Sequence, residues 1–178
     1  CGRFSPSLIV PIVCFCVALL AGILQVNAAT LIPPAAQWRY QKGLTEASTP
    51  ADAWREVTFD DSGWGLSAMP YSYGESLGGT TLNDMRGFYT SVFLRRTFDV
   101  ANPGAARILE LMTRSDGGCI AWINGVGVFR YNMPEGEVAA SASSMPALAE
   151  PIPWLTTVIT NGHELLNVGP NVLAIHAF

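Results

Sequence analysis

The fifteen residues from Asp116 to Arg130, DGGCIAWINGVGVFR, decide the fold of this chain. They contain two apolar, β-prone runs, Cys119–Ile123 and Val126–Phe129, which Asn124-Gly125 joins. A two-residue Asn-Gly link is the strongest short-range signal for a β-hairpin, because both residues tolerate the positive φ that a type I′ turn requires. We therefore expect an antiparallel hairpin here, in which Asn124 and Gly125 have a structural role.

On both sides of the hairpin, strand-like segments alternate with turn signals along the chain. No helix longer than about two turns is convincing, although Thr49 and Pro50 suit the start of a single helical turn over Ala51–Trp54. The spacing of strands and turns predicts an all-β fold, an antiparallel β-sandwich or jelly roll. The other expected strands are Gln37–Lys42, Ser91–Val100, Arg107–Thr113, Trp154–Ile159 and Asn171–Phe178.

The first 28 residues have the pattern of a secretory signal peptide. Arg3 precedes an apolar run from Leu8 to Leu24, and Val26 and Ala28 supply a cleavage site. We expect a mature start near Ala29 and therefore an exported protein, which is secreted, periplasmic or at the cell surface. The alternative is an uncleaved membrane anchor, for which the 17-residue run is at the short end.

The expected organisation after residue 28 is a linker over residues 29–36 and one β-sandwich over residues 37–178. Without Arg3 this part has 9 Lys+Arg and 14 Asp+Glu, a net charge of −5, and it has no basic cluster. Nucleic acid is therefore not an expected partner, and contact with a membrane is expected only through an uncleaved leader. Cys119 is the one cysteine outside the leader, so we expect it to be a buried small hydrophobe without a disulfide.

The residues that usually carry catalysis are sparse. His163 and His176 are the only histidines, and neither has a Cys or His at metal-ligand spacing or an evident Ser or Cys nucleophile. Asp60 and Asp61 are expected to cap the turn in which they lie, with a structural calcium ion as the competing interpretation. We therefore predict no catalytic residue and no other cofactor in this segment.

Several segments together resemble the galactose-binding-like β-sandwich. They are FDDSGW at Phe59–Trp64, FLRRTFDV at Phe93–Val100 in combination with the hairpin, and GPNVLAIHAF at Gly169–Phe178. The form that they resemble lies near the N-terminus of large exported bacterial proteins with lamin-tail or spore-coat-kinase-like modules. A looser resemblance is to the sugar-binding jelly roll of family 2 glycoside hydrolases.

The resemblance runs from Gln37 to Phe178, and the order and spacing of the motifs carry it, because each motif alone is common in β proteins. It implies a non-catalytic carbohydrate-binding or spacer module, with other domains of the same polypeptide as neighbours and a further strand after Phe178 that would complete the sandwich. Fold does not establish function, so two other roles stay open. One is an accessory N-terminal domain of a secreted glycosidase or phosphoesterase with its catalytic domain beyond residue 178, and the other is a purely structural cell-surface module.

Glycan binding would require planar aromatic faces and polar groups on loops at an edge of the sandwich. The loop from Tyr71 to Tyr89 and the residues just after the hairpin offer both. The competing interpretation is that Arg86 pairs with Asp84 or a backbone carbonyl, while the tyrosines pack the loop down. The candidate ligand-binding residues are Tyr73, Asp84, Arg86, Tyr89, Arg130 and Asn132.

Overall fold

The computed structural model describes residues 29–34, 36–145 and 152–178, so the expected leader lies outside the described residues. In these ranges no helix has the length and apolar character needed to cross a bilayer. The strands are β1 Gln37–Lys42, β2 Gly65–Ala68, β3 Tyr71–Ser72, β4 Thr80–Thr81, β5 Val92–Val100, β6 Leu109–Thr113, β7 Cys119–Ile123, β8 Val126–Tyr131, β9 Leu155–Ile159 and β10 Gly169–Ala177. The helical turns are η1 Ala53–Arg55, η2 Pro103–Ala105 and α1 Gly162–Leu165.

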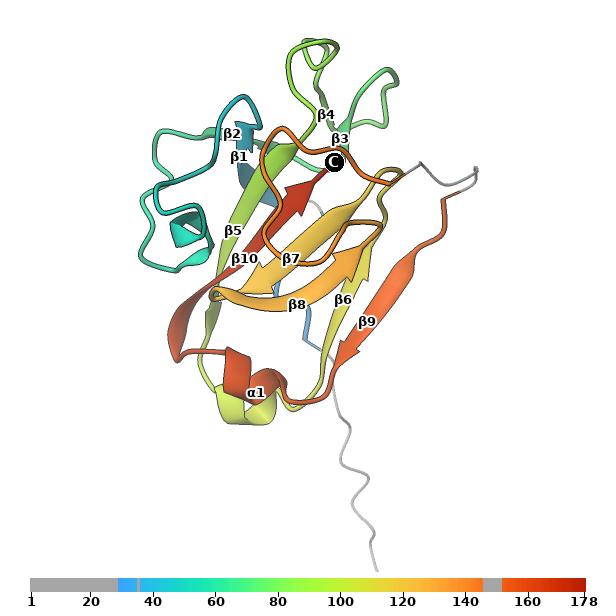
Figure 1. The fold of residues 1–178 in the computed structure, drawn as a ribbon. Helices are drawn as coiled ribbons and strands as arrows, with labels where there is room; N and C mark the ends of the chain where they lie inside the picture. Colours follow the sequence, from blue (N-terminus) through green and yellow to red (C-terminus); the bar gives the residue numbers. More distant parts are fainter. Residues whose placement is uncertain (1–28, 35, 146–151) are drawn as a thin grey trace, which may run out of the picture.

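One antiparallel sheet of six strands organises the molecule, in the order β2-β1-β5-β10-β7-β8 (Figure 1). Its centre is the long pairing of β5 with β10, which runs from Val92 opposite Ala177 to Val100 opposite Gly169. β10 is thus inserted between β5 and β7, although it is the last of the six in the chain. The expected all-β fold is confirmed.

One face of this sheet is covered by the second layer of the sandwich, the antiparallel pair β6–β9, together with the loop that carries the parallel pair β3–β4. Leu109 and Leu111 of β6 point inward, while Met112 is exposed. The large sheet contributes alternate residues to this core, as the period of a strand requires. The buried residues that β5, β7 and β10 contribute to this core include Val92, Leu94, Val100, Ala121, Ile123, Leu173 and Ile175.

Two irregular segments, residues 47–64 and 133–142, cover the opposite face of the sheet in place of strands. Trp54 is the centre of this second core, with 1% of its surface exposed, and it makes edge contacts with Phe93 and Trp122 at ring distances of 5.0 and 5.6 Å. Phe93 and Arg95 of β5 lie on this face, and so do Ile120 and Trp122 of β7.

The hairpin that decides the fold has the expected turn. Asn124 and Gly125 both have positive φ, 49° and 81°, as a type I′ turn requires. A β-bulge lies further along, where Ala121 is opposite Phe129 and Trp122 is opposite Gly127, so Val128 is the extra residue.

Two local expectations need correction. The helical turn begins at Ala53 after Asp52, because Ser48 organises the preceding loop: its hydroxyl donates to the Pro50 carbonyl at 2.6 Å and accepts from the Trp54 amide at 3.0 Å. The segment from Tyr71 to Tyr89, expected to be a loop, contains the two short strands β3 and β4.

Candidate ligand-binding hollow

A shallow hollow of about 350 Å³ lies at the end of β1, beyond the residue at which β2 stops pairing with it. Two half-buried aromatic side chains, Tyr40 and Trp64, form walls of this hollow. Tyr40 packs against the first core and Trp64 against the second, and polar residues such as Gln41 and Thr45 line the hollow with them, so the hollow combines aromatic and hydrogen-bonding residues. The hollow is lined by Tyr40, Gln41, Lys42, Leu44, Thr45, Gly63, Trp64 and Gly65.

The Tyr40 wall depends on a glycine. Tyr40 is opposite Gly65 in the β1–β2 pairing, and a Cβ atom at Gly65 would lie 2.3 Å from the Tyr40 ring. The absence of a side chain therefore lets the ring lie directly over β2. On its other side Tyr40 packs against Tyr71 at a centroid distance of 5.5 Å.

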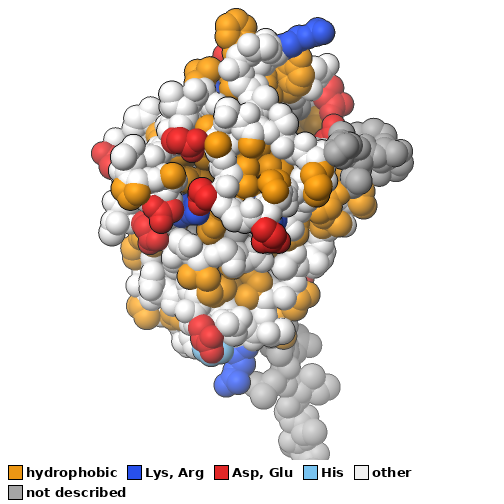
Figure 2. All heavy atoms as spheres, viewed as in Figure 1, with side chains coloured by type: hydrophobic (Ala, Val, Ile, Leu, Met, Phe, Trp, Pro, Cys, Tyr) orange, Lys and Arg blue, Asp and Glu red, His pale blue; other side chains and the backbone are white. Residues whose placement is uncertain are grey.

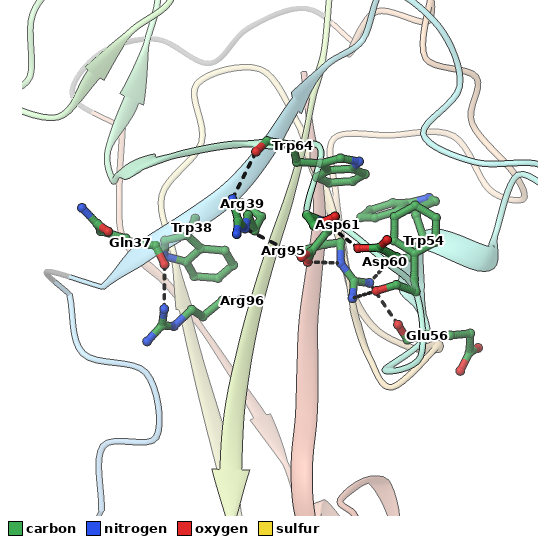
Figure 3. Close-up of polar contacts among 12 residues, drawn as sticks. Gln37, Trp38, Arg39, Trp54, Glu56, Asp60, Asp61, Trp64, Arg95 and Arg96 are labelled. Atoms are coloured by element: carbon green, nitrogen blue, oxygen red, sulfur yellow. Dashed lines mark hydrogen bonds and ion pairs between the residues drawn. The ribbon is translucent and has the colours of Figure 1, made fainter.

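The Trp64 wall is held in place by the loop before β2 (Figure 3). The Trp64 amide donates to the Asp61 carbonyl at 3.0 Å, and the Trp64 carbonyl accepts from Arg39 Nη1 at 3.3 Å. Its ring packs against Trp54 and Phe59 at centroid distances of 6.2 and 5.8 Å. This wall is consequently continuous with the second core.

Arg95 ties that loop to the sheet and is 1% exposed. Arg95 Nε donates to Asp61 Oδ2 at 2.8 Å. Its other nitrogens donate to the carbonyl groups of Trp54, Glu56 and Phe59 (Figure 3). A buried guanidinium needs a counter-charge and acceptors for its donors, and the loop supplies both.

Asp60 and Asp61 have different roles. Asp60 caps the turn as expected, because its Oδ1 accepts from the Ser62 amide at 2.9 Å, and this hydrogen bond lowers the pKa of the Asp60 carboxyl. Asp61 instead pairs with Arg95 and lies 3.8 Å from Arg39 Nε. Two positive neighbours oppose a cation at Asp61. Among the described residues no three His, Cys, Asp or Glu side chains gather as a metal site would require.

Two of the predicted ligand-binding residues, Asp84 and Tyr89, meet at the rim of the hollow through Lys42. Lys42 Nζ donates to Asp84 Oδ2 at 2.5 Å, and the Tyr89 hydroxyl donates to Asp84 Oδ1 at 2.8 Å. The hydrogen bond from Lys42, followed by that from Tyr89, lowers the pKa of the Asp84 carboxyl. Burial, assisted by Asp84, raises the pKa of Tyr89. In the competing interpretation Arg86 pairs with Asp84 or a backbone carbonyl; Asp84 pairs with Lys42 instead, while Tyr89 packs in the core as that interpretation expects.

The other predicted residues are divided between exposed and bonded positions. Tyr73 is 45% exposed, and Arg86 is exposed in the same loop. Arg130 donates to the carbonyl groups of Pro134 and Gly136, and Asn132 donates to those of Gly117 and Met145. Both therefore brace the loop after β8, and the structure does not bring them together with Asp84.

Sequence reasoning missed the hollow itself. The aromatic walls come from β1 and from the loop before β2, which the alternation of β1 and the FDDSGW motif indicated only as packing. One signal was available: Lys42 is the only lysine in the chain.

The structure also pairs a serine with a histidine that sequence reasoning had left alone. His176 Nε2 is 2.9 Å from Ser91 Oγ, which donates to the Ala140 carbonyl at 2.7 Å. Ser91 and His176 are 0% and 1% exposed, and burial, with the charge of Arg55, lowers the pKa of His176 to about 3. Cys119 is also buried, which raises the pKa of its thiol to about 11. These groups are enclosed in the core and do not face a substrate.

No protein-family model matches the sequence, and no curated protein matches it. Several solved structures of glycosidases are similar to this chain. A β-glucuronidase from Ruminococcus gnavus matches with a TM-score of 0.50 and 10% identity over 80% of this chain and 20% of that one. A β-glucuronidase from Bifidobacterium dentium matches with a TM-score of 0.47 and 18% identity over 82% of this chain and 20% of that one. A family 2 glycosyl hydrolase from Bacteroides cellulosilyticus matches with a TM-score of 0.46 and 15% identity over 80% of this chain and 16% of that one.

This chain spans one fifth or less of the length of those three enzymes. The likeness to the Ruminococcus enzyme shows the fold alone. It agrees with the β-sandwich that the resemblance to family 2 glycoside hydrolases implies. The fold of this chain is thus an antiparallel β-sandwich that also occurs as part of a much larger β-glucuronidase.

Proposed function

We propose that this module is non-catalytic and binds a glycan in the hollow at the end of β1. The observation that carries the proposal is the pair of half-buried rings, Tyr40 and Trp64, in one concave surface of about 350 Å³. Such faces stack on the C–H groups of a pyranose, while Gln41 and Thr45 supply hydrogen-bonding groups for its hydroxyls. The module would be exported as part of a longer polypeptide of the kind that carries lamin-tail or spore-coat-kinase-like domains.

The shape of the hollow sets an expectation for affinity. It is open and shallow, so it covers one face of a sugar and leaves the other in water. Drug-sized ligands that bind tightly bury most of their surface, and this site does not provide that burial. We therefore expect millimolar dissociation constants for a single pyranose, with stronger binding for a polymer that presents many copies.

A titration followed by ¹H–¹⁵N NMR tests the site, with methyl β-D-galactopyranoside as the probe. We expect chemical-shift changes around Tyr40, Lys42 and Trp64. Gln41→Ala should weaken binding several-fold without unfolding the protein, because it removes a lining side chain and leaves the aromatic packing. Gly65→Ala should weaken it further by displacing the Tyr40 ring.

Trp154→Ala is the matched control, because Trp154 is 63% exposed and does not line the hollow. Arg86→Ala extends the test to the exposed part of the 71–89 loop. Tyr89→Ala is unsuitable, since Tyr89 is 6% exposed and packs in the core. Shift changes remote from Tyr40 and Trp64, or none at tens of millimolar sugar, would refute the assignment of this hollow.

A second candidate function is an accessory domain of a secreted glycosidase. The fold shared with part of a Ruminococcus gnavus β-glucuronidase favours it over the other open role, a purely structural surface module. Translation of the genomic locus past the codon for Phe178 distinguishes them. A downstream domain with paired carboxylates supports the accessory role, whereas anchoring or repeated β-modules support the structural one.

A further inference from the structure

Lys42 has an unusual position for the only lysine of a 178-residue chain. It is the last residue of β1, its side chain is 32% exposed, and it lines the hollow beside the aromatic walls. Of the described residues that line the hollow, it is the one that carries a formal charge. The charge that a ligand meets there is therefore set by Lys42 and by whatever Lys42 contacts.

Asp84 forms a direct ion pair with Lys42. The Nζ to Oδ2 distance is 2.5 Å, and Tyr89 fixes the carboxylate from its other side with a hydroxyl-to-Oδ1 distance of 2.8 Å. Since Tyr89 is buried, its hydroxyl is held in a definite place by the core. The lysine and the aspartate together contribute no net charge to the hollow.

An acidic sugar and a neutral one therefore meet different conditions. The carboxylate of a uronic acid gains little from a lysine that is already paired, and it is repelled by Asp84. A neutral pyranose loses nothing by the pairing, because it needs ring faces and hydrogen-bonding groups. The net charge of the chain, −4, acts in the same sense, and Figure 2 shows Asp and Glu side chains scattered over the face that it presents and Lys or Arg in only a few places.

We infer that the hollow selects neutral over acidic sugars and that Asp84, by occupying Lys42, is the residue that determines this selectivity. The inference rests on the proposed function, since it concerns the same hollow. Asp84 is then the specificity-determining residue, and Tyr89 positions its carboxylate.

The test compares two probes that differ only at C6, methyl β-D-glucopyranoside and methyl β-D-glucuronide. Reductive methylation with ¹³C-formaldehyde preserves the charge of the lysine and gives a ¹³C signal from Lys42 beside that of the N-terminal amine. Dissociation constants for both probes are measured by NMR titration at low salt. The proteins are the wild type, Asp84→Asn and the control Asp99→Asn.

Asp99 is exposed and lies near the far end of β5 from Val92, the residue opposite Lys42, so Asp99→Asn makes the same charge change away from the hollow. We expect the wild type and Asp99→Asn to prefer the neutral probe. Asp84→Asn frees Lys42 and should shift the ratio of the two dissociation constants about two- to fivefold toward the acidic probe, the range expected for an exposed ion pair. The shift should diminish at 0.5 M salt.

Equal binding of both probes by the wild type, or an unchanged ratio in Asp84→Asn, would overturn the inference while leaving glycan binding in place. Failure of both probes with every protein would overturn the proposed function instead. A ¹H–¹⁵N spectrum of Asp84→Asn with the same dispersion as the wild type distinguishes these cases from a misfolded variant.

Discussion

Asn171 accepts a hydrogen bond at its Oδ1 from Asn124 Nδ2 across 2.7 Å, although the two residues are 47 positions apart. Asn124 also donates to the Leu165 carbonyl at 2.8 Å, and its Oδ1 accepts from the Val172 amide at 2.9 Å. The turn residue of the β7–β8 hairpin is therefore bonded to both sides of the loop that leads into β10. This hydrogen bond therefore connects the Asn-Gly turn of the hairpin to β10, a central strand of the large sheet.

Asn171 is the hub of this network, and we expect Asn171→Ala to lower the free energy of unfolding by about 2–4 kcal/mol. Asn171 is 0% exposed, and it bonds the Asn167 amide and the carbonyl groups of Asn167 and Gly169 in addition to Asn124. Its loss leaves several buried groups without partners. Urea denaturation measures the change. Asn161→Ala is the control, because Asn161 bonds the exposed Glu164 and should change stability by less than about 0.5 kcal/mol.

Gly125→Val should cost about 1–3 kcal/mol, because a β-branched residue resists the φ of 81° at this position. A Cβ atom there would also lie 2.1 Å from Glu56 Oε1, so that side chain must move. Thermal unfolding followed by circular dichroism gives the result. Gly127→Ala serves for comparison in the same hairpin, since its Cβ would meet Trp122 at an ordinary 3.7 Å. Equal melting temperatures for the two variants would contradict the type I′ turn.

Arg95→Met should destabilise the module by about 3–5 kcal/mol, because it leaves Asp61 without its buried partner. The loop that carries Trp64 should then loosen, and tryptophan emission should shift to the red. Arg114→Met, at an exposed position, provides the control. If Arg95→Met does not fold, Arg95→Lys keeps the charge but loses the fork of donors and should still unfold at lower urea than the wild type. Unchanged unfolding in Arg95→Lys would show that the charge alone suffices.

His176 should make the stability of the fold fall in weak acid. Burial lowers its pKa to about 3 in the folded state, compared with about 6.5 in an unfolded chain. The unfolded chain therefore binds a proton first, and stability decreases by up to about 1.4 kcal/mol per pH unit as the pH falls from about 6.5 toward 3. His176→Gln removes this titration while the carboxylates remain. Urea midpoints between pH 7 and 4 should fall less steeply in that variant, and parallel curves would refute the assignment.

The sequence predicts five of the six strands of the large sheet, all except β2, because the signals for those five are local. Asn124-Gly125 specifies a turn by backbone geometry alone, and alternation assigns the residues of β5 to the correct faces. The candidate site is predicted less well, because its parts meet only through long-range packing. Lys42 and Asp84 are 42 positions apart, and no pattern in either segment indicates that one will neutralise the other.

The loops that cover the second core also cannot be predicted from local sequence patterns. Arg95 looks like an exposed strand residue on the polar side of the alternation, yet it is among the most buried side chains of the described structure. Its burial results from carbonyl groups that the loop over residues 54–61 turns toward it, and such a loop has no periodicity to recognise. The expectation that Asp61 caps its own turn is therefore corrected: its carboxylate accepts from the buried Arg95.

The position of β10 between β5 and β7 has a consequence for biosynthesis. As the ribosome elongates the chain, five strands of the large sheet leave the exit tunnel before the one that joins them. The two halves, β2-β1-β5 and β7-β8, have no common hydrogen bonds until residues 169–177 arrive. Closing contacts over such sequence distances is entropically costly and slow. The nascent module thus exposes the facing edges of β5 and β7 until β10 is made.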